Sequence, residues 1–329
     1  MKKLALLITF LLSALPGYGQ QLSQFSQYLD NQYLINPAAT DIQNSVKIGL
    51  GYRQQWGDVP GNPKTLYLTA YAPLSKPSES QYMRASMRLN GRVRSSDFNT
   101  NTKPGISHIV GTIITNDDFG LFNKTTVHFS YGIHLPLASN LSISAAPKIG
   151  LVNLNLNNGL WVLEDEDTPF QSFLGSYSSE TMFDIGFGIW LYSDRFFLGY
   201  SLEQLSSNNL EQLDQVSGYE FIPHHFFSLG YAFQINPYFR LVPGAMVRYL
   251  STSPLNIDYS IRLEYKNRVW LGMSLRKENA LVGMLGLYVN SNIKFNYTYD
   301  HGMASGGRDG LNAHEISLKI SAFQNLYKK

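Results

Sequence analysis

Apolar and polar residues alternate at every second position from Val46 almost to the end of the chain. Between residues 127 and 135 the odd positions are Val, Phe, Tyr, Ile and Leu, while the even positions are His, Ser, Gly and His. The same alternation appears at residues 46–56, 183–191 and 257–265. A period of two predicts β-strands with one apolar and one polar face.

A soluble β-sandwich and a membrane β-barrel both produce this alternation, and three features favour the barrel. Many segments run for about 9 to 12 residues, the length that a tilted strand needs to cross a bilayer. The polar faces carry many Gly and other small residues, as the wall of a lumen does. An amino-terminal export signal, described below, places the chain outside the cytoplasm.

We therefore predict an all-β fold, a transmembrane antiparallel β-barrel of about 14 strands preceded by a polar N-terminal segment. An even strand number is the rule in bacterial single-chain barrels. The facing of segment 280–290 is ambiguous, because both of its faces are apolar. The predicted strands are residues 46–56, 64–73, 105–116, 123–136, 141–152, 181–191, 195–204, 224–235, 238–250, 256–265, 269–276, 280–290, 292–300 and 312–323.

Connection lengths support the barrel independently. The connections that follow odd-numbered strands include the long stretches 153–180, 204–223 and 301–311, while those after even-numbered strands are mostly two to four residues long. Outer-membrane barrels have long outer loops and short periplasmic turns. The exception is the basic stretch 74–104, which is either a periplasmic insert, the favoured reading, or two further strands.

The first residues resemble a cleaved secretory signal. Lys2 and Lys3 precede an apolar core, and Gly17-Tyr18-Gly19 supplies small residues before Gln20. We expect a signal peptide at 1–19, a periplasmic or luminal segment at 20–44, the barrel at 45–323 and a tail at 324–329. The expected location is the cell outer membrane, with outer-membrane lipid around the barrel.

Composition narrows the function classes. The chain has no Cys, which excludes thiol catalysis, disulfides and a lipoprotein anchor. Its 26 Lys+Arg and 24 Asp+Glu nearly balance, so a nucleic-acid partner is not expected. Charged residues are only 15% and mean hydropathy is −0.15, which suits a barrel and not a helical membrane protein.

No catalytic, metal or cofactor site is predicted. The pairs His314-Glu315, His224-His225 and Asp300-His301 are adjacent in strands, so their side chains point to opposite faces and cannot converge. The acidic run 164–167 is expected to be a solvated outer loop. We expect no enzyme; a barrel hydrolase with dispersed residues is a remote third class. Trp56 and Tyr67 are candidates for the aromatic girdle at the membrane interface.

Charged residues of the C-terminal half gather on the predicted lumen face. They form either a self-paired interior network or a surface that grips an inserted peptide or the chain's own N-terminal segment. Segment 20–44 is expected to fold into the periplasmic mouth and narrow it. The candidate partner-binding residues are Arg240, Arg248, Arg262, Arg276 and Lys294. Others in the same phase are Asp258, Glu264, Asp300, Glu315 and Lys319.

Several short motifs follow one another along the mature chain in a characteristic order. They are Gln24-Phe25-Ser26-Gln27-Tyr28 with Asn36-Pro37-Ala38, Tyr52-Arg53-Gln54-Gln55-Trp56 with Gly61-Asn62-Pro63-Lys64-Thr65, Asn116-Asp117-Asp118-Phe119-Gly120, Phe183-Asp184-Ile185-Gly186-Phe187-Gly188, and Tyr297-Thr298-Tyr299-Asp300 with His314-Glu315-Ile316-Ser317-Leu318. Together they resemble the PorP/SprF family of outer-membrane proteins of Bacteroidota.

The resemblance implies a barrel that works with the type IX secretion system. It implies a role in protein secretion, gliding motility or adhesin anchoring. The expected partner is a type IX secreted surface protein or a secretion or motility component. The alternative function is an outer-membrane channel or transporter for hydrophobic or small solutes, which predicts an unblocked pore or a side opening.

Overall fold

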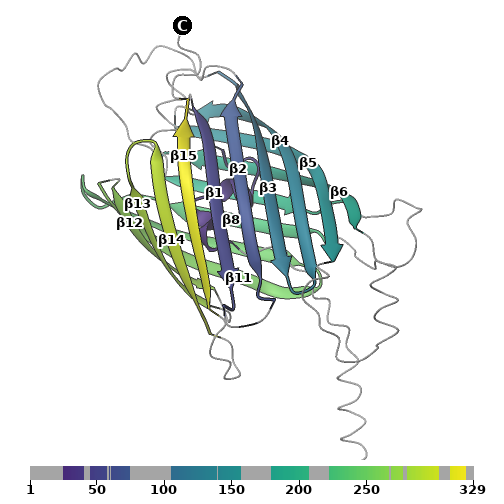
Figure 1. Cartoon of the computed structure of the whole chain (residues 1–329). Coiled ribbons are helices and arrows are strands. Elements are labelled where there is room, and N and C mark those ends of the chain that lie inside the picture. The colour runs from purple at the N-terminus through teal and green to yellow at the C-terminus, as the bar shows by residue number, and fades with distance from the viewer. Residues whose placement is uncertain are drawn as a thin grey trace, which may run out of the picture.

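The computed structural model describes residues 25–40, 45–57, 59, 61–74, 105–138, 140–156, 179–206, 222–266, 268–276, 280–303 and 312–323. Two short 3-10 helices precede the strands (Figure 1). The elements are η1 (Ser26–Leu29), η2 (Gln32–Leu34), β1 (Val46–Gln55), β2 (Lys64–Pro73), β3 (Ser107–Phe119), β4 (Phe122–Ala138), β5 (Leu141–Leu156), β6 (Glu180–Ser193), β7 (Phe196–Glu203), β8 (His224–Tyr231), β9 (Phe233–Gln234), β10 (Phe239–Leu250), β11 (Ser253–Tyr265), β12 (Val269–Arg276), β13 (Ala280–Tyr288), β14 (Ile293–Gly302) and β15 (Ala313–Ala322).

The strands form one closed antiparallel barrel. Each strand pairs with its neighbour in sequence, except that β8 and β9 both pair with β10, and β15 pairs with β1 from Val46↔Ala322 to Gln55↔Ala313, which closes the sheet. β8 and β9 are two parts of one wall strand, so the barrel has 14 strands, as the alternation predicts. Within the described residues, no helix has the length and hydrophobicity to cross a membrane.

The break between β8 and β9 has a chemical cause. β10 pairs with β8 as far as Gly244↔Gly230 and resumes with β9 at Leu241↔Phe233. Pro243 lies in the gap and has no backbone N–H to donate to the ladder. The interruption is therefore local, and the barrel wall continues past it.

Residues 75–104 lie outside the described residues. β2 pairs directly with β3, from Lys64↔Asp118 to Pro73↔Ile109. The barrel therefore has no place for two further strands between them, which rules out the 16-strand alternative. The acidic run 164–167 also lies outside the described residues, as do 1–24, 41–44 and 324–329.

The two ends of the barrel differ in their connections. The end where β15 finishes, at the top of Figure 1, carries the short connections 194–195, 235–238, 266–268 and 289–292, with 74–106 as the long exception. The opposite end carries the long connections 157–179, 204–223 and 303–312, besides short turns such as 120–121 and 251–252. By the usual asymmetry of such barrels the first end faces the periplasm and the second faces outward.

The lumen is a packed interior. Inward-facing side chains are buried along every strand but the two-residue β9, and they include Trp270, Arg262 and Glu315. β13 was ambiguous because Ala280, Val282 and Met284 pack inward against an apolar cluster that also includes Tyr28. One girdle prediction is wrong. Trp56 is exposed, but Tyr67 points into the lumen, where its ring packs edge-on against Phe25.

Candidate functional site

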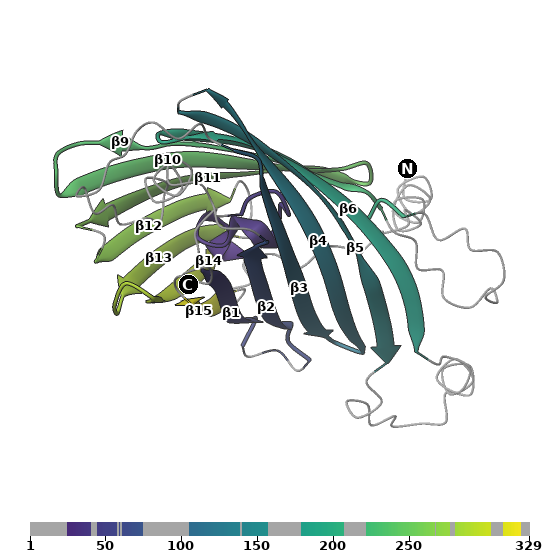
Figure 2. The same ribbon diagram turned by 90° about the horizontal axis from the view of Figure 1, so that it is seen from above.

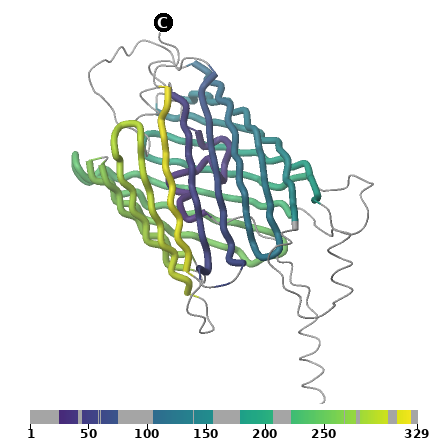
Figure 3. Tube along the Cα trace, in the orientation of Figure 1, coloured from purple at the N-terminus to yellow at the C-terminus, as the bar shows by residue number. Residues whose placement is uncertain are grey.

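Residues 25–40, called the plug below, lie inside the barrel and are almost entirely buried. The purple coil enclosed by the strands in Figure 2, and the purple tube in Figure 3, are this segment. Ser26, Tyr33 and Asn36 are each 1% exposed, and Ala38 is fully buried. Segment 20–44 was expected to be periplasmic or luminal and to narrow the periplasmic mouth; its described part lies in the lumen.

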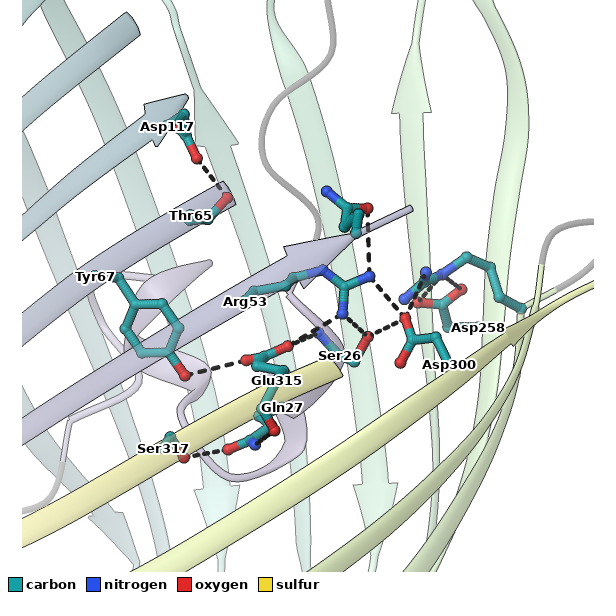
Figure 4. Close-up of polar contacts among 12 residues, drawn as sticks. Ser26, Gln27, Arg53, Thr65, Tyr67, Asp117, Asp258, Asp300, Glu315 and Ser317 are labelled. Atoms are coloured by element: carbon teal, nitrogen blue, oxygen red, sulfur yellow. Dashed lines mark hydrogen bonds and ion pairs between the residues drawn. The ribbon is translucent and has the colours of Figure 1, made fainter. Parts of the chain in front are cut away.

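Charged side chains of three strands hold the first turn of the plug (Figure 4). The Ser26 backbone N–H donates to Glu315 Oε2 at 2.8 Å, and its hydroxyl donates to Asp300 Oδ2 at 2.6 Å. Arg53 Nη1 donates to Ser26 Oγ at 2.8 Å, and Arg53 Nη2 pairs with Asp300 Oδ2 at 2.7 Å. The plug thus contacts β1 and β15, the two strands that close the barrel, and the adjacent β14.

Asp30 is the centre of a second buried cluster. Lys294 donates directly to its carboxylate, Lys319 Nζ lies 3.3 Å from Oδ2, and Arg262 Nη1 lies 3.8 Å from Oδ1. Asn296 Nδ2 donates to Oδ2 at 3.0 Å. Burial alone would raise the pKa of Asp30, but the three cations outweigh it and hold that pKa well below its usual range.

This depressed pKa gives a pH prediction. A carboxyl whose pKa is lowered in the docked state stabilises docking above its ordinary pKa, and that stabilisation is lost as pH falls through the docked value. Docking should therefore be unchanged from pH 8 to about pH 5 and weaken only below about pH 4. Hydrogen exchange of the plug amides across a pH series, corrected for intrinsic rates, would measure it. Release of the plug between pH 5 and 7 would show that another group controls docking.

Backbone and amide contacts hold the other half of the plug. Asn36 Nδ2 donates to the carbonyl oxygens of Ile189 and Tyr200, both at 3.1 Å. The Asn36 side chain also accepts from the Ala38 N–H at 2.9 Å. Ser144 Oγ donates to the Ala38 carbonyl at 2.7 Å. The Asn36-Pro37-Ala38 motif is thus bound to β5, β6 and β7 by hydrogen bonds.

Glycines make room for the plug on the strands that face it. A Cβ added at Gly188 would overlap Asn36 Oδ1 and approach Pro37 Cδ to 2.9 Å. A Cβ at Gly111 would overlap the Tyr33 hydroxyl, and one at Gly49 would lie 3.1 Å from Asn31 Nδ2. The wall and the plug are therefore complementary in shape at three separate points.

All five candidate partner-binding residues face the lumen. Lys294 and Arg262 hold Asp30 of the plug. Arg276 pairs with Asp258 at 3.2 Å, and Arg240 lies 3.9 Å from Glu264. Arg248 lies over the Phe226 ring, 5.8 Å from its centroid. The lumen charges form an interior network and also hold the chain's own N-terminal segment; binding of a separate partner stays a prediction.

Sequence reasoning did not identify the plug residues Ser26, Asp30 and Asn36 individually. One signal could have found Asp30. The inward charged residues noted above comprise six cations and four carboxylates, so the cations outnumber the carboxylates. Asp30 is the only acidic residue in 20–40 and is therefore the one that this segment could supply to them. A second network, His128 with Asp184 at 2.8 Å and Lys148 with Glu203, was also missed.

The adjacent pairs point to opposite faces, as strand geometry predicts. Glu315 and His224 are buried in the lumen, while His314 and His301 lie on the outside. Across the part of the chain that the structure describes, no three His, Asp or Glu side chains form a group able to hold a metal ion.

Residues 18–320 match the family described as type IX secretion system membrane protein PorP/SprF. The chain belongs to this family. A search of curated proteins gives no match. The PorP/SprF family and the barrel fold together make the chain a type IX secretion barrel and imply the outer membrane as its location.

Several solved outer-membrane proteins resemble this PorP/SprF member at low identity. Omp33 of Acinetobacter baumannii has a TM-score of 0.47 and 7% identity, covering 86% of this chain and 100% of its own. The P. putida toluene transporter TodX has a TM-score of 0.42 and 10% identity, covering 85% and 91%. A Pseudomonas aeruginosa FadL homologue has 0.44 and 9%, covering 88% and 93%. Likeness at this level carries no information on what this chain binds.

Proposed function

We propose that the chain is a plugged docking barrel that binds a protein partner of the type IX pathway. The partner is a secreted surface protein of the adhesin or gliding type, or a component of the secretion machinery. The proposal assigns the barrel no catalytic step. Family membership supports the pathway, and the plug supports docking over transport.

The observation that carries the proposal is the way in which the plug is held. Two buried ionic clusters, centred on Ser26 and Asp30, attach it to β1, β11, β14 and β15. The Asn36-Pro37-Ala38 motif attaches it to the opposite wall. A solute channel needs a continuous path, and a segment fixed to both walls works against one. A docking barrel needs only a rigid body.

Two measurements on the intact barrel test the proposal. Affinity purification of the tagged chain from outer membranes is expected to recover a type IX component or a secreted surface protein, while an unrelated tagged barrel from the same membranes recovers neither. In planar bilayers the purified barrel is expected to be electrically silent. Steady conductance with uptake of a hydrocarbon, and no type IX protein in the eluate, would favour the channel instead.

A further inference from the structure

The longest strands of the barrel are neighbours. β4, β5 and β6 have 17, 16 and 14 residues, and β3 beside them has 13, as β11 has on the other side of the barrel, whereas β7, β8 and β12 have 8 each. Figure 2 shows β3 to β6 running side by side as long arrows. These four strands form the tall wall.

The apolar outer surface covers only part of this wall. Along β4, the outward positions from 127 to 137 are Val, Phe, Tyr, Ile, Leu and Leu. With the usual strand rise and tilt they span about 27 Å, close to the ~25 Å apolar band of outer-membrane barrels. β4 continues beyond them towards the outer end, so its remaining outward positions lie at the level of the outer lipid head groups.

The outward surface of the tall wall changes character at that level. Its side chains become amides and hydroxyls, and strand register places them next to one another: Asn116 opposite Thr125, Thr125 opposite Asn153, and Asn153 opposite Thr181. The members of this amide face are Asn116, Asn123, Thr125, Asn153, Asn155 and Thr181.

Hydrogen bonds fix these side chains in place. Asn116 Nδ2 donates to Thr125 Oγ1 at 2.8 Å and to Asn123 Oδ1 at 3.0 Å. Asn153 Nδ2 donates to Thr181 Oγ1 at 2.8 Å. The side chains are nonetheless half-exposed or exposed. An ordered surface of uncharged amide and hydroxyl groups therefore faces sideways, just outside the apolar band, and its side chains are open to a ligand on their exposed side.

We propose that the amide face binds the sugar head group of an outer-leaflet glycolipid. Sugar hydroxyls both donate and accept hydrogen bonds, as Asn and Thr side chains do. Phosphate recognition relies on Arg and Lys. None of the six members of the amide face is charged, and at its edge strand register places Asp118 opposite the exposed Lys64 of β2, so the one cation there has a carboxylate beside it. Protein interfaces are enriched in Tyr, Trp, Met and Arg, which the amide face lacks.

The test uses the triple variant Asn123→Val, Asn153→Val and Asn155→Val. Valine favours strands, so the wall should persist, and heat-modifiable migration in gels checks that the barrel folds. The matched control is Gln234→Val, which removes an exposed amide at the periplasmic end. Binding is measured in nanodiscs with lipopolysaccharide that carries its core oligosaccharide and, separately, with lipid A alone.

The wild type and Gln234→Val are expected to bind the sugar-bearing lipid equally well. The triple variant should bind it about tenfold more weakly, as the loss of one or two hydrogen bonds implies, with lipid A binding unchanged. Equal losses for both lipids would point to the phosphates and overturn the proposal. No loss of binding for either lipid would also overturn the proposal, because the amide face would then only stabilise the wall. Loss of protein recovery with unchanged glycolipid binding would assign the face to a protein.

If the triple variant does not fold, the single variant Asn155→Val keeps the test decisive. Asn155 donates to Asn153 Oδ1 at 2.6 Å near the outer end of β5, so its loss disturbs the ladder least. The lipid measurements do not depend on plug docking or on a type IX partner. A negative lipid result therefore does not contradict the proposed docking function. A negative docking result likewise does not contradict the lipid proposal.

Discussion

Asp30→Asn is expected to release the plug from the lumen and turn an electrically silent barrel into a conducting one. The substitution keeps the side-chain volume but leaves Lys294 and Arg262 buried beside a neutral amide. Removing one partner of a buried ion pair costs about 3 to 5 kcal/mol. That loss raises the population with an undocked plug by roughly 10²- to 5 × 10³-fold. Planar-bilayer recording would show this as discrete openings.

Two companion variants separate charge pairing from general damage. Asp118→Asn makes the same substitution at a half-exposed position of the outer wall, where a lost surface charge contributes about 0 to 1 kcal/mol, so the barrel should stay silent. Adding Lys294→Met to Asp30→Asn removes the cation that donates directly to Asp30, and should restore part of the docking. A silent Asp30→Asn barrel with normal plug protection would show that Asp30 does not hold the plug.

The barrel itself could be predicted because a membrane strand is specified locally. Alternation over ten residues fixes which face meets lipid, and the predicted strands agree with the observed ones over most of their length. The main differences lie at the outer ends. β3 was predicted to end at 116 and β5 at 152, but they continue to Phe119 and Leu156. Apolar alternation stops there because the outward positions have left the lipid.

The same rule explains the turn between β3 and β4. The predicted strand ended at 116, and residues 116–120 resembled the second outer turn of the PorP/SprF family, yet Asn116 and Asp117 pair within the strand. The turn itself is made by Gly120 and Leu121, with Gly120 at φ 59°. In such a strand, the change from apolar to polar outward residues marks the point where the strand leaves the membrane. It does not mark the point where the strand ends.

The plug could not be assembled from the sequence in the same way. It has no periodicity, and its partners are remote: Asp30 meets Lys294 across 264 positions, and Ser26 meets Glu315 across 289. The alternation of the strands predicts that Lys294 and Glu315 face the lumen, but it does not predict which groups pair with them. That pairing depends on barrel closure, which brings β1 beside β15.

Gly188→Ala is expected to push the Asn36-Pro37-Ala38 motif off the wall. The added methyl group would overlap Asn36 Oδ1, which also accepts from the Ala38 N–H, and would lie 3.1 Å from the Ala38 nitrogen. The Asn36 amide is tied to two carbonyl oxygens, so it cannot turn aside without losing them. Overpacking of this kind costs about 1 to 3 kcal/mol. Since the chain has no Cys, a single Ala38→Cys reports the displacement through maleimide labelling.

Ala38 is fully buried, so its thiol in the Gly188 parent should react only when the plug opens. Gly188→Ala should raise the labelling rate about 5- to 100-fold. Gly283→Ala is the matched control, because a Cβ there would meet nothing within 4 Å. Equal labelling rates in all three backgrounds would mean that the plug does not pack against the wall at Gly188. A large difference would show that a strand glycine is needed for the lumen to accept its own N-terminal segment.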